Sequence, residues 1–216
     1  VNLRRHINNI RKFKLFVPKS RDGKYEILNV LINKELGFIA PRTALINVII
    51  GGKSFKAIFQ EDISKELLEF NNFHESIIIE GDEGFYPFTI PKIINTNKIL
   101  GQNQNMISRK ALKKISSVYN KTAKLNFYNK HDNPMLIDFL PPESKEINVL
   151  FNLLNYSLKL QQGLVTEDHR FFYDKISKKF YPIYYDGHFN ERGFEKPNFK
   201  FSINHQNYLI NKLNKI

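Results

Sequence analysis

Two aspartates, Asp168 and Asp186, flank a segment near the end of the sequence that has the pattern of a β-hairpin. The run TEDHRFFYDKISKKFYPIYYDGH predicts two antiparallel strands with a turn near residues 176–178. If the strands pair symmetrically about Ser177, Asp168 lies opposite Asp186, with the two Cα atoms about 4.5–5.5 Å apart. Two carboxylates this close repel each other unless a cation or a shared proton lies between them. Mg²⁺ or Mn²⁺, which bind carboxylate oxygens together with substrate phosphates, would suit this pair.

The same spacing is typical of phosphotransferases of the protein-kinase type. These enzymes place a base-like Asp before one strand and a metal-binding Asp, followed closely by Gly, after the next. Asp168 would then orient or deprotonate the acceptor hydroxyl, and Asp186, followed by Gly187, would hold the metal that bridges the phosphates. The alternative is structural, because Asp pairs across hairpins are frequent: two solvated aspartates at strand ends, or an ion pair between Asp168 and Arg170.

A site of this type also needs a lysine for the phosphates and an acid that positions the lysine. Lys12 and Lys14 alternate with Phe13 and Leu15, so both lie on the polar face of one predicted strand, where either could bind a nucleotide or be solvated. Glu61 ends another predicted strand and is the candidate for the acid. Its alternative role is that of a glutamate at a helix N-terminus, which the helix dipole favours.

The elements that must position these residues follow from local patterns. The first half of the chain predicts a strand over residues 12–17, a turn over 18–23, and a helix over 26–36 that Gly37 ends. The helix pattern rests on Ile27, Val30, Leu31 and Leu36. A hairpin follows, with strands over 44–50 and 54–59 joined across Gly51-Gly52, whose positive φ angles suit a tight primed turn.

The second half predicts further helices and strands. Asp62 could cap a helix over 63–70, and a buried strand is expected over 77–80. Residues 106–128 are expected to be partly helical, residues 143–162 form the clearest helical pattern, and the last hairpin would use residues 170–173 and 180–185. These elements predict an α+β fold of antiparallel hairpins and packed helices, in one domain over residues 1–216 that we expect to be part of a longer chain.

Composition excludes several classes of protein. The chain has 216 residues and no cysteine, which excludes a disulfide scaffold, a thiolate zinc site and a cysteine nucleophile. No run of 18 apolar residues is present, so we expect no membrane span, and the basic N-terminal segment does not resemble a secretion signal.

The net charge of +12 also admits an RNA-binding domain. Its base-stacking platform would be the aromatic residues of the last hairpin, interleaved with Arg170, Lys178 and Lys179. Alternating aromatic residues are more often core packing, however, and the lysines are spread along the whole chain. Binding to nucleic acid is therefore the less favoured alternative.

Three segments resemble, in order, those of the spore-coat CotH kinase family, a group of atypical secreted protein kinases. KFKLFV resembles the family's KSFKIKF strand, and LINVIIGGKSFKAIFQEDISKELLEF resembles its vfvNGkyyGvYlltEkidkefL block. EDHRFFYDKISKKFYPIYYDGH resembles its DHNyyLYrd and tgkfefiPWDlD blocks. The likeness covers about 180 residues and is diffuse between these blocks.

The resemblance implies an atypical kinase-like fold that binds ATP and transfers its γ-phosphoryl group to Ser or Thr hydroxyls of a protein, assisted by Mg²⁺ or Mn²⁺. It puts catalytic or metal-binding roles on Asp168 and Asp186, a nucleotide-positioning role on Glu61, and a secreted or cell-envelope location on the whole protein.

The chain departs from the family pattern at two places. The Asn of DHN is replaced by Arg170, a cation where the family has a metal ligand, and the second acid of PWDxD is replaced by His188. Because fewer acidic ligands weaken metal binding, a catalytically inactive kinase-like domain that binds a partner or envelope component is the main alternative.

Overall fold

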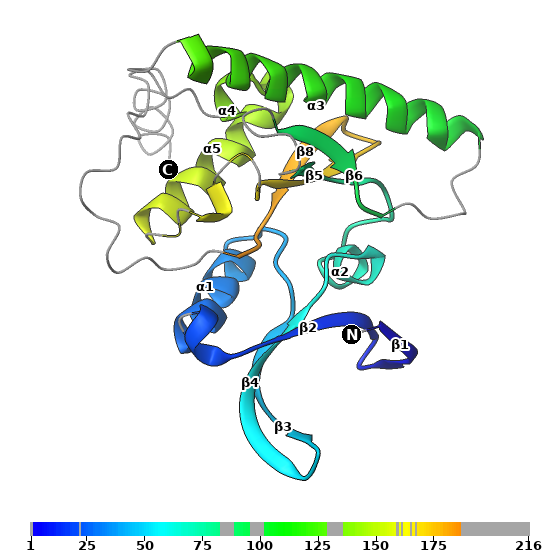
Figure 1. Cartoon of the computed structure of the whole chain (residues 1–216). Coiled ribbons are helices and arrows are strands. Elements are labelled where there is room, and N and C mark those ends of the chain that lie inside the picture. The colour runs from blue at the N-terminus through cyan, green and yellow to red at the C-terminus, as the bar shows by residue number, and fades with distance from the viewer. Residues whose placement is uncertain are drawn as a thin grey trace.

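The computed structural model describes residues 2–21, 23–82, 89–95, 102–128, 136–158, 160, 162–164, 166 and 168–186. Within these residues the chain forms two four-stranded antiparallel sheets with helices packed beside them (Figure 1). This arrangement confirms the predicted α+β class. That residues 1–216 form one domain, and that the fold is kinase-like, stay predictions.

The first sheet has the strand order β1-β2-β4-β3. Its strands are β1 (Asn2–Ile7), β2 (Ile10–Phe16), β3 (Thr43–Ile50) and β4 (Lys53–Glu61). The β3–β4 hairpin closes at Ile50 and Lys53, and Gly51 and Gly52 have φ angles of +56° and +76°. Two consecutive positive φ angles define a type I′ turn, so the predicted hairpin and the strand over 12–17 are both confirmed.

Helix α1 (Lys24–Glu35) follows the 3₁₀ turn η1 (Pro18–Arg21) and confirms the predicted helix. It ends as a Schellman motif: Gly37 has φ +83°, its amide donates to the Lys34 carbonyl, and the Phe38 amide donates to the Asn33 carbonyl. The predicted apolar face, however, is largely wrong. Val30 is buried, but Leu31 and Leu36 are 50% and 59% exposed.

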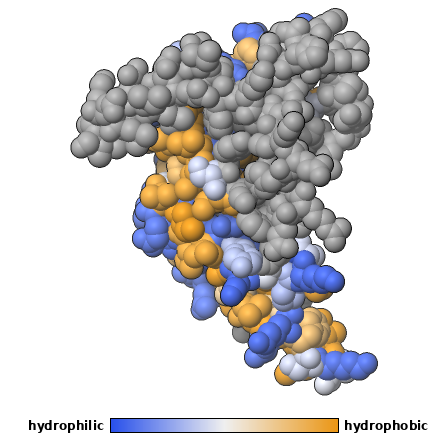
Figure 2. Space-filling view, turned by 90° about the vertical axis from the view of Figure 1, so that its left-hand side faces the viewer, coloured by the Kyte–Doolittle hydropathy of each residue, from blue (hydrophilic) through white to orange (hydrophobic). Residues whose placement is uncertain are grey.

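The buried side of α1 is mostly polar because its partners are polar. Its buried residues are Glu26, Asn29, Val30 and Asn33. Asn33 exchanges amide hydrogen bonds of 3.1 and 3.2 Å with Asn155. Figure 2 shows the consequence on the opposite side, where apolar residues lie at the surface over α1 and down to the tip of the β3–β4 hairpin.

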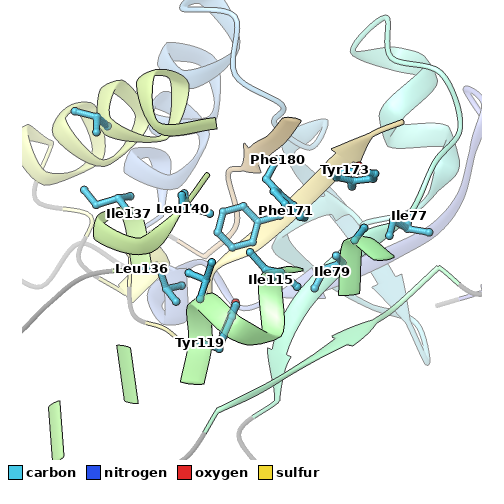
Figure 3. Packing of buried hydrophobic residues seen from close by; sticks show 13 residues of the cluster. Ile77, Ile79, Ile115, Tyr119, Leu136, Ile137, Leu140, Phe171, Tyr173 and Phe180 are labelled. Carbon is cyan, nitrogen blue, oxygen red and sulfur yellow. The ribbon is translucent and has the colours of Figure 1, made fainter. Parts of the chain in front are cut away.

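The second sheet has the order β6-β5-β7-β8. Its strands are β5 (Ile78–Asp82), β6 (Ile90–Ile93), β7 (Arg170–Asp174) and β8 (Lys179–Ile183). Helices α3 (Gln102–Tyr128), α4 (Leu136–Phe139) and α5 (Pro142–Ser157) cover it. The largest cluster of buried apolar residues lies between them, with Phe171, Ile79, Ile115, Tyr119 and Leu140 among its members (Figure 3).

Two predicted helices differ from the structure at their ends. Helix α2 is shorter than expected (Lys65–Phe70), and its N-cap is Ser64; Asp62 instead accepts a 3.1 Å hydrogen bond from the Ile63 amide. The helix predicted over 143–162 ends at Ser157, and Gly163 lies in the 3₁₀ turn η3 (Gln162–Leu164). The glycine that follows the predicted range, Gly163, therefore lies well beyond the end of the helix.

Candidate functional site

The β7–β8 hairpin has a register one residue away from the predicted one. Asp174 pairs with Lys179 and Arg170 with Ile183, so paired residue numbers add to 353 rather than 354. The reason is the turn, which holds four residues instead of three. The Asp174 carboxylate accepts hydrogen bonds from the Ile176 amide (2.9 Å) and the Ser177 hydroxyl (2.5 Å), which stabilise the larger turn.

The ladder also ends before it reaches either aspartate. After Ile183 the chain leaves β7, and the Tyr184 amide donates to the Ile39 carbonyl at 2.8 Å. The prediction that Asp168 and Asp186 face each other as a cross-strand pair is therefore wrong. A metal ion shared between them stays a prediction.

Asp186 lies next to a cation that the sequence did not indicate. Its carboxylate forms an ion pair with Arg21 of η1, and both side chains are 13% exposed. The Arg21 guanidinium also lies over the Phe16 ring, 4.2 Å from its centroid. Asp186 has a left-handed backbone, with φ +51°. Any metal ion that binds Asp186 must therefore displace Arg21 or share the carboxylate with it.

The structure distinguishes the two candidate lysines. The Lys14 ammonium donates a 2.6 Å hydrogen bond to the Tyr185 hydroxyl and lies 3.6 Å from the Asp62 carboxylate, whereas Lys12 is exposed. Lys14 and Tyr185 are 171 positions apart, so this contact joins β2 of the first sheet to the residue before Asp186.

Arg170 also contacts Tyr185. Its guanidinium carbon is 3.5 Å from the centroid of the Tyr185 ring, and its Nε donates to Glu80 at 2.9 Å. Its Nη1 donates to the Asp168 carbonyl at 3.2 Å. We call Lys14, Asp62, Arg170 and Tyr185 the Tyr185 cluster.

Both candidate aspartates adjoin the Tyr185 cluster. Asp186 follows Tyr185 in the chain, and the carbonyl of Asp168 binds Arg170. The cluster therefore brings together Lys14 and the backbone next to the two acids. Asp62 and Tyr185 were not predicted as members of the cluster. For Asp62 strand alternation offered a signal, since Asp62 lies two residues after Gln60, the partner of Lys14, and so on the same face.

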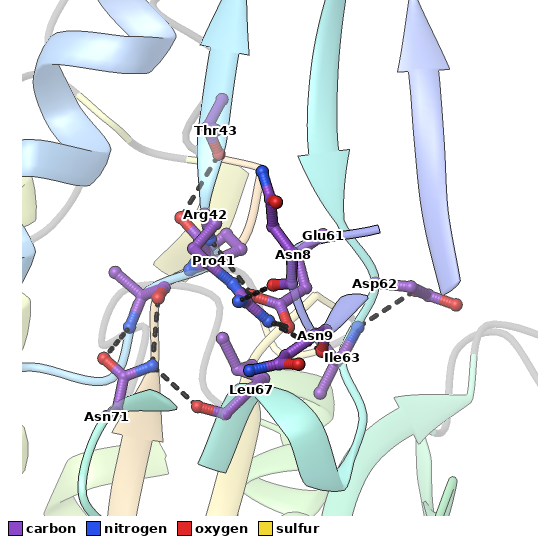
Figure 4. A network of polar contacts seen from close by, with 11 residues as sticks. Asn8, Asn9, Pro41, Arg42, Thr43, Glu61, Asp62, Ile63, Leu67 and Asn71 are labelled. Atoms are coloured by element: carbon purple, nitrogen blue, oxygen red, sulfur yellow. Dashed lines mark hydrogen bonds and ion pairs between the residues drawn. The ribbon is translucent and has the colours of Figure 1, made fainter. Parts of the chain in front are cut away.

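Glu61 does not join them. In the β2–β4 register Lys14 pairs with Gln60 and Phe13 with Glu61, so Lys14 and Glu61 lie on opposite faces of the sheet. Glu61 is buried and accepts two hydrogen bonds from the Arg42 guanidinium, at 2.8 Å from Nε and 2.5 Å from Nη2, and a third from the Arg42 amide at 3.3 Å (Figure 4). The prediction that Glu61 pairs with a strand lysine is therefore wrong. The alternative, a glutamate in the first turn of a helix, is wrong as well, because Glu61 is the last residue of β4 and α2 begins at Lys65.

A buried acid on the Lys14 side of the sheet is Glu26 of α1, which the sequence did not single out. It is 2% exposed and accepts hydrogen bonds from the Gln60 amide and the Tyr184 hydroxyl, both at 2.9 Å. The available signal was the polar stripe Glu26, Asn29 and Asn33 at helical spacing. A polar stripe of this kind indicates an exposed face by default, which is why it was missed.

His169, between Asp168 and Arg170, is buried in the core. It is 2% exposed, its ring is 4.6 Å from that of Phe171, and neither ring nitrogen has a hydrogen-bond partner among the described residues. Burial, followed by the charge of Arg170, lowers the pKa of His169 to about 4. The imidazole is therefore neutral at pH 7 and packs as an aromatic ring.

The donors for a metal ion are few. Within the described residues there is no group of three or more His, Asp or Glu side chains arranged to hold a metal. When substrate phosphates supply the other ligands, Mg²⁺ needs only one or two carboxylates. Asp186 and Asp168 could provide these carboxylates. His188 lies outside the described residues.

The aromatic residues of the last hairpin are packed inside the protein. Phe171, Phe172, Phe180 and Tyr184 are each at most 1% exposed. Buried rings cannot stack on bases, so the predicted RNA-binding platform is wrong and the core-packing alternative is confirmed. The exposed part of the hairpin is its turn, residues 176–178.

Comparison with known proteins assigns no family: no family model and no curated protein matches the chain. Among the residues that the structure describes, none of the helices combines the length and the apolar character needed to cross a membrane.

Proposed function

We propose that this chain is a kinase-like domain of the CotH type that binds ATP with Mg²⁺ or Mn²⁺ beside the Tyr185 cluster and phosphorylates protein Ser or Thr hydroxyls. The observation that supports it is the 2.6 Å hydrogen bond between Lys14 and Tyr185. It puts a strand lysine next to the backbone that carries Asp186, which is the combination that phosphoryl transfer requires.

In this proposal Lys14 exchanges its contact with Tyr185 for a phosphate oxygen of the nucleotide. Asp186, with Asp168, would hold the metal ion, which neutralises charge on the phosphates. The oxygen of the substrate hydroxyl bonds to the γ-phosphorus, and the Asp168 carboxylate accepts the proton of that hydroxyl. The bond from that phosphorus to the β,γ-bridging oxygen breaks, and ADP leaves with the electron pair.

A second candidate is a non-catalytic kinase-like domain that binds a partner or an envelope component. The ion pair between Arg21 and Asp186 favours it, because a cation of the protein already lies at the metal-binding acid. Arg170 adds a second cation next to Tyr185. An inactive domain of this kind would bind nucleotide weakly or without metal.

Calorimetry of ATP binding, with and without Mn²⁺, tests the proposal on the full chain and four variants. We expect Mn²⁺-dependent binding that is lost in Asp186→Asn and weakened at least tenfold in Lys14→Met. Lys12→Met is the matched control, since Lys12 is an exposed lysine on the same strand, and should bind as the wild type does. Arg21→Gln should bind Mn²⁺–ATP more tightly, because Asp186 loses a competing cation.

Phosphate transfer from γ-labelled ATP to a generic protein acceptor then separates the two candidates. Binding without transfer supports the non-catalytic domain. Absence of ATP binding in a sample shown to be folded by circular dichroism, or equal effects of Lys14→Met and Lys12→Met, overturns the nucleotide site.

A further inference from the structure

Helix α3 has an unusual distribution of charge. Its 27 residues include no Asp or Glu, and they include six cations, at positions 109, 110, 113, 114, 121 and 124. One side of the helix is in the core, where Ala111, Ile115, Val118 and Tyr119 are at most 3% exposed. All six cations are exposed, so the whole positive charge of α3 lies on its outer side.

The outer side of α3 is open to a ligand. Figure 1 shows α3 along the upper edge of the molecule, with the second sheet beneath it. Lys114 forms an ion pair with Glu143 of α5. The other five cations make no ion pair with any residue in the described parts of the chain. We call these five residues the α3 basic face.

The α3 basic face also has a shape suited to a phosphate backbone. Arg109, Lys113, Lys121 and Lys124 border a hollow of about 680 Å³, and small polar residues such as Ser117 and Asn120 lie between them. From residue 109 to residue 124 the helix rises about 22 Å. That length equals about six base pairs of duplex, at about 3.4 Å for each phosphate of one strand.

We propose that the α3 basic face binds the phosphate backbone of a nucleic-acid duplex without reading its sequence. A single strand is usually held by aromatic rings that stack on its bases, and between Arg109 and Lys124 the only aromatic ring, Tyr119, is buried. A membrane-surface helix inserts its apolar side into lipid, but the apolar side of α3 is already packed in the core. The α3 basic face offers positive charge without exposed aromatic or apolar side chains, which favours a duplex over a single strand or a membrane.

This binding site is separate from the proposed nucleotide site, so either can fail without the other. The test uses a fluorescent 20-base-pair DNA duplex and measures anisotropy from 25 to 200 mM NaCl, a range chosen because backbone contacts release counterions. The variant Arg109→Glu, Lys113→Glu, Lys121→Glu is compared with Arg11→Glu, Lys53→Glu, Lys56→Glu. Both change one Arg and two Lys, all exposed, so the net charge is the same in the two variants.

The α3 variant should lose at least tenfold in affinity at 50 mM NaCl. The slope of log K against log[NaCl] should become less steep by about 2.7, which is about 0.9 for each of the three lost phosphate contacts. The control should keep the steeper slope of the wild type. Equal losses in both variants, or tighter α3-dependent binding to a single strand of the same length or to vesicles with anionic lipid, would overturn the proposal.

Discussion

Protonation of His169 should set the acid stability of the fold. Its pKa falls from 6.5 in an exposed histidine to about 4 in the folded protein, because burial disfavours the imidazolium and Arg170 adds repulsion. Between these two pH values the unfolded chain binds a proton at this residue and the folded protein does not. Stability is therefore fully present above pH 6.5 and is lost as pH falls toward 4.

The size of the effect follows from the two pKa values. Each pH unit between them is worth about 1.4 kcal/mol, so the full contribution is about 3 kcal/mol, of which about 2 kcal/mol is lost between pH 7.5 and pH 5. That is a large part of the stability of an ordinary domain, about 5–15 kcal/mol.

The variant His169→Phe isolates this effect because phenylalanine keeps a ring of similar size and cannot be protonated. Urea unfolding followed by far-ultraviolet circular dichroism, at pH 7.5, 6.0 and 5.0, gives the free energy of unfolding of both proteins. Other titrating groups cancel in the difference between them. At pH 7.5 we expect the variant to be at least as stable as the wild type, since the two ring nitrogens have no partner among the described residues.

As pH falls to 5, the advantage of His169→Phe should grow by about 2 kcal/mol. A difference that stays constant from pH 7.5 to 5 would contradict this prediction, because it would mean that His169 has the same pKa in the folded and unfolded chain. A difference that shrinks would mean that the folded protein stabilises the imidazolium. His169→Leu serves as a second variant if the phenylalanine ring does not fit.

Three further experiments test the packing and the turns. Arg42→Met should cost about 3–5 kcal/mol in urea unfolding, because it leaves the buried Glu61 carboxylate unpaired, and the added change Glu61→Gln should recover much of that loss. Gly52→Ala should cost about 1–2 kcal/mol, since φ +76° is unfavourable for alanine; a loss near zero would contradict the type I′ turn. Val30→Ser should lower the thermal midpoint by several degrees and Leu31→Ser should leave it nearly unchanged, whereas equal effects would show that both sides of α1 are buried.

The elements that were predicted correctly are those that depend on local sequence signals. Gly51 and Gly52 sit between two β-rich runs, and a tight turn with two positive φ angles needs little more than those residues. Gly37 likewise ended α1 through hydrogen bonds that span only a few positions. Such interactions depend on neighbours in the chain, so the α+β class could be predicted from the sequence.

The register of the last hairpin was the first point that local signals left open. A turn of three or four residues fits the same sequence. The hydrogen bonds that the Asp174 carboxylate accepts, together with the exit of the chain toward Ile39, decide between them. A change of one residue alters every cross-strand partner. For that reason the sequence identified Asp168 and Asp186 as acids near one hairpin but could not determine what faces them.

The partners of the polar residues were decided by tertiary structure alone. Lys12 and Lys14 have the same place in the strand pattern, and only the approach of Tyr185, 171 positions away from Lys14, distinguishes them. Glu61 is paired by Arg42, and Glu26 is buried because Tyr184 and Gln60 offer it hydrogen bonds. Hydrophobic periodicity predicts which face of a helix or strand is buried when that face is apolar. A polar residue, by contrast, is buried where the fold supplies a hydrogen-bond partner, and here that partner lies far away in the sequence.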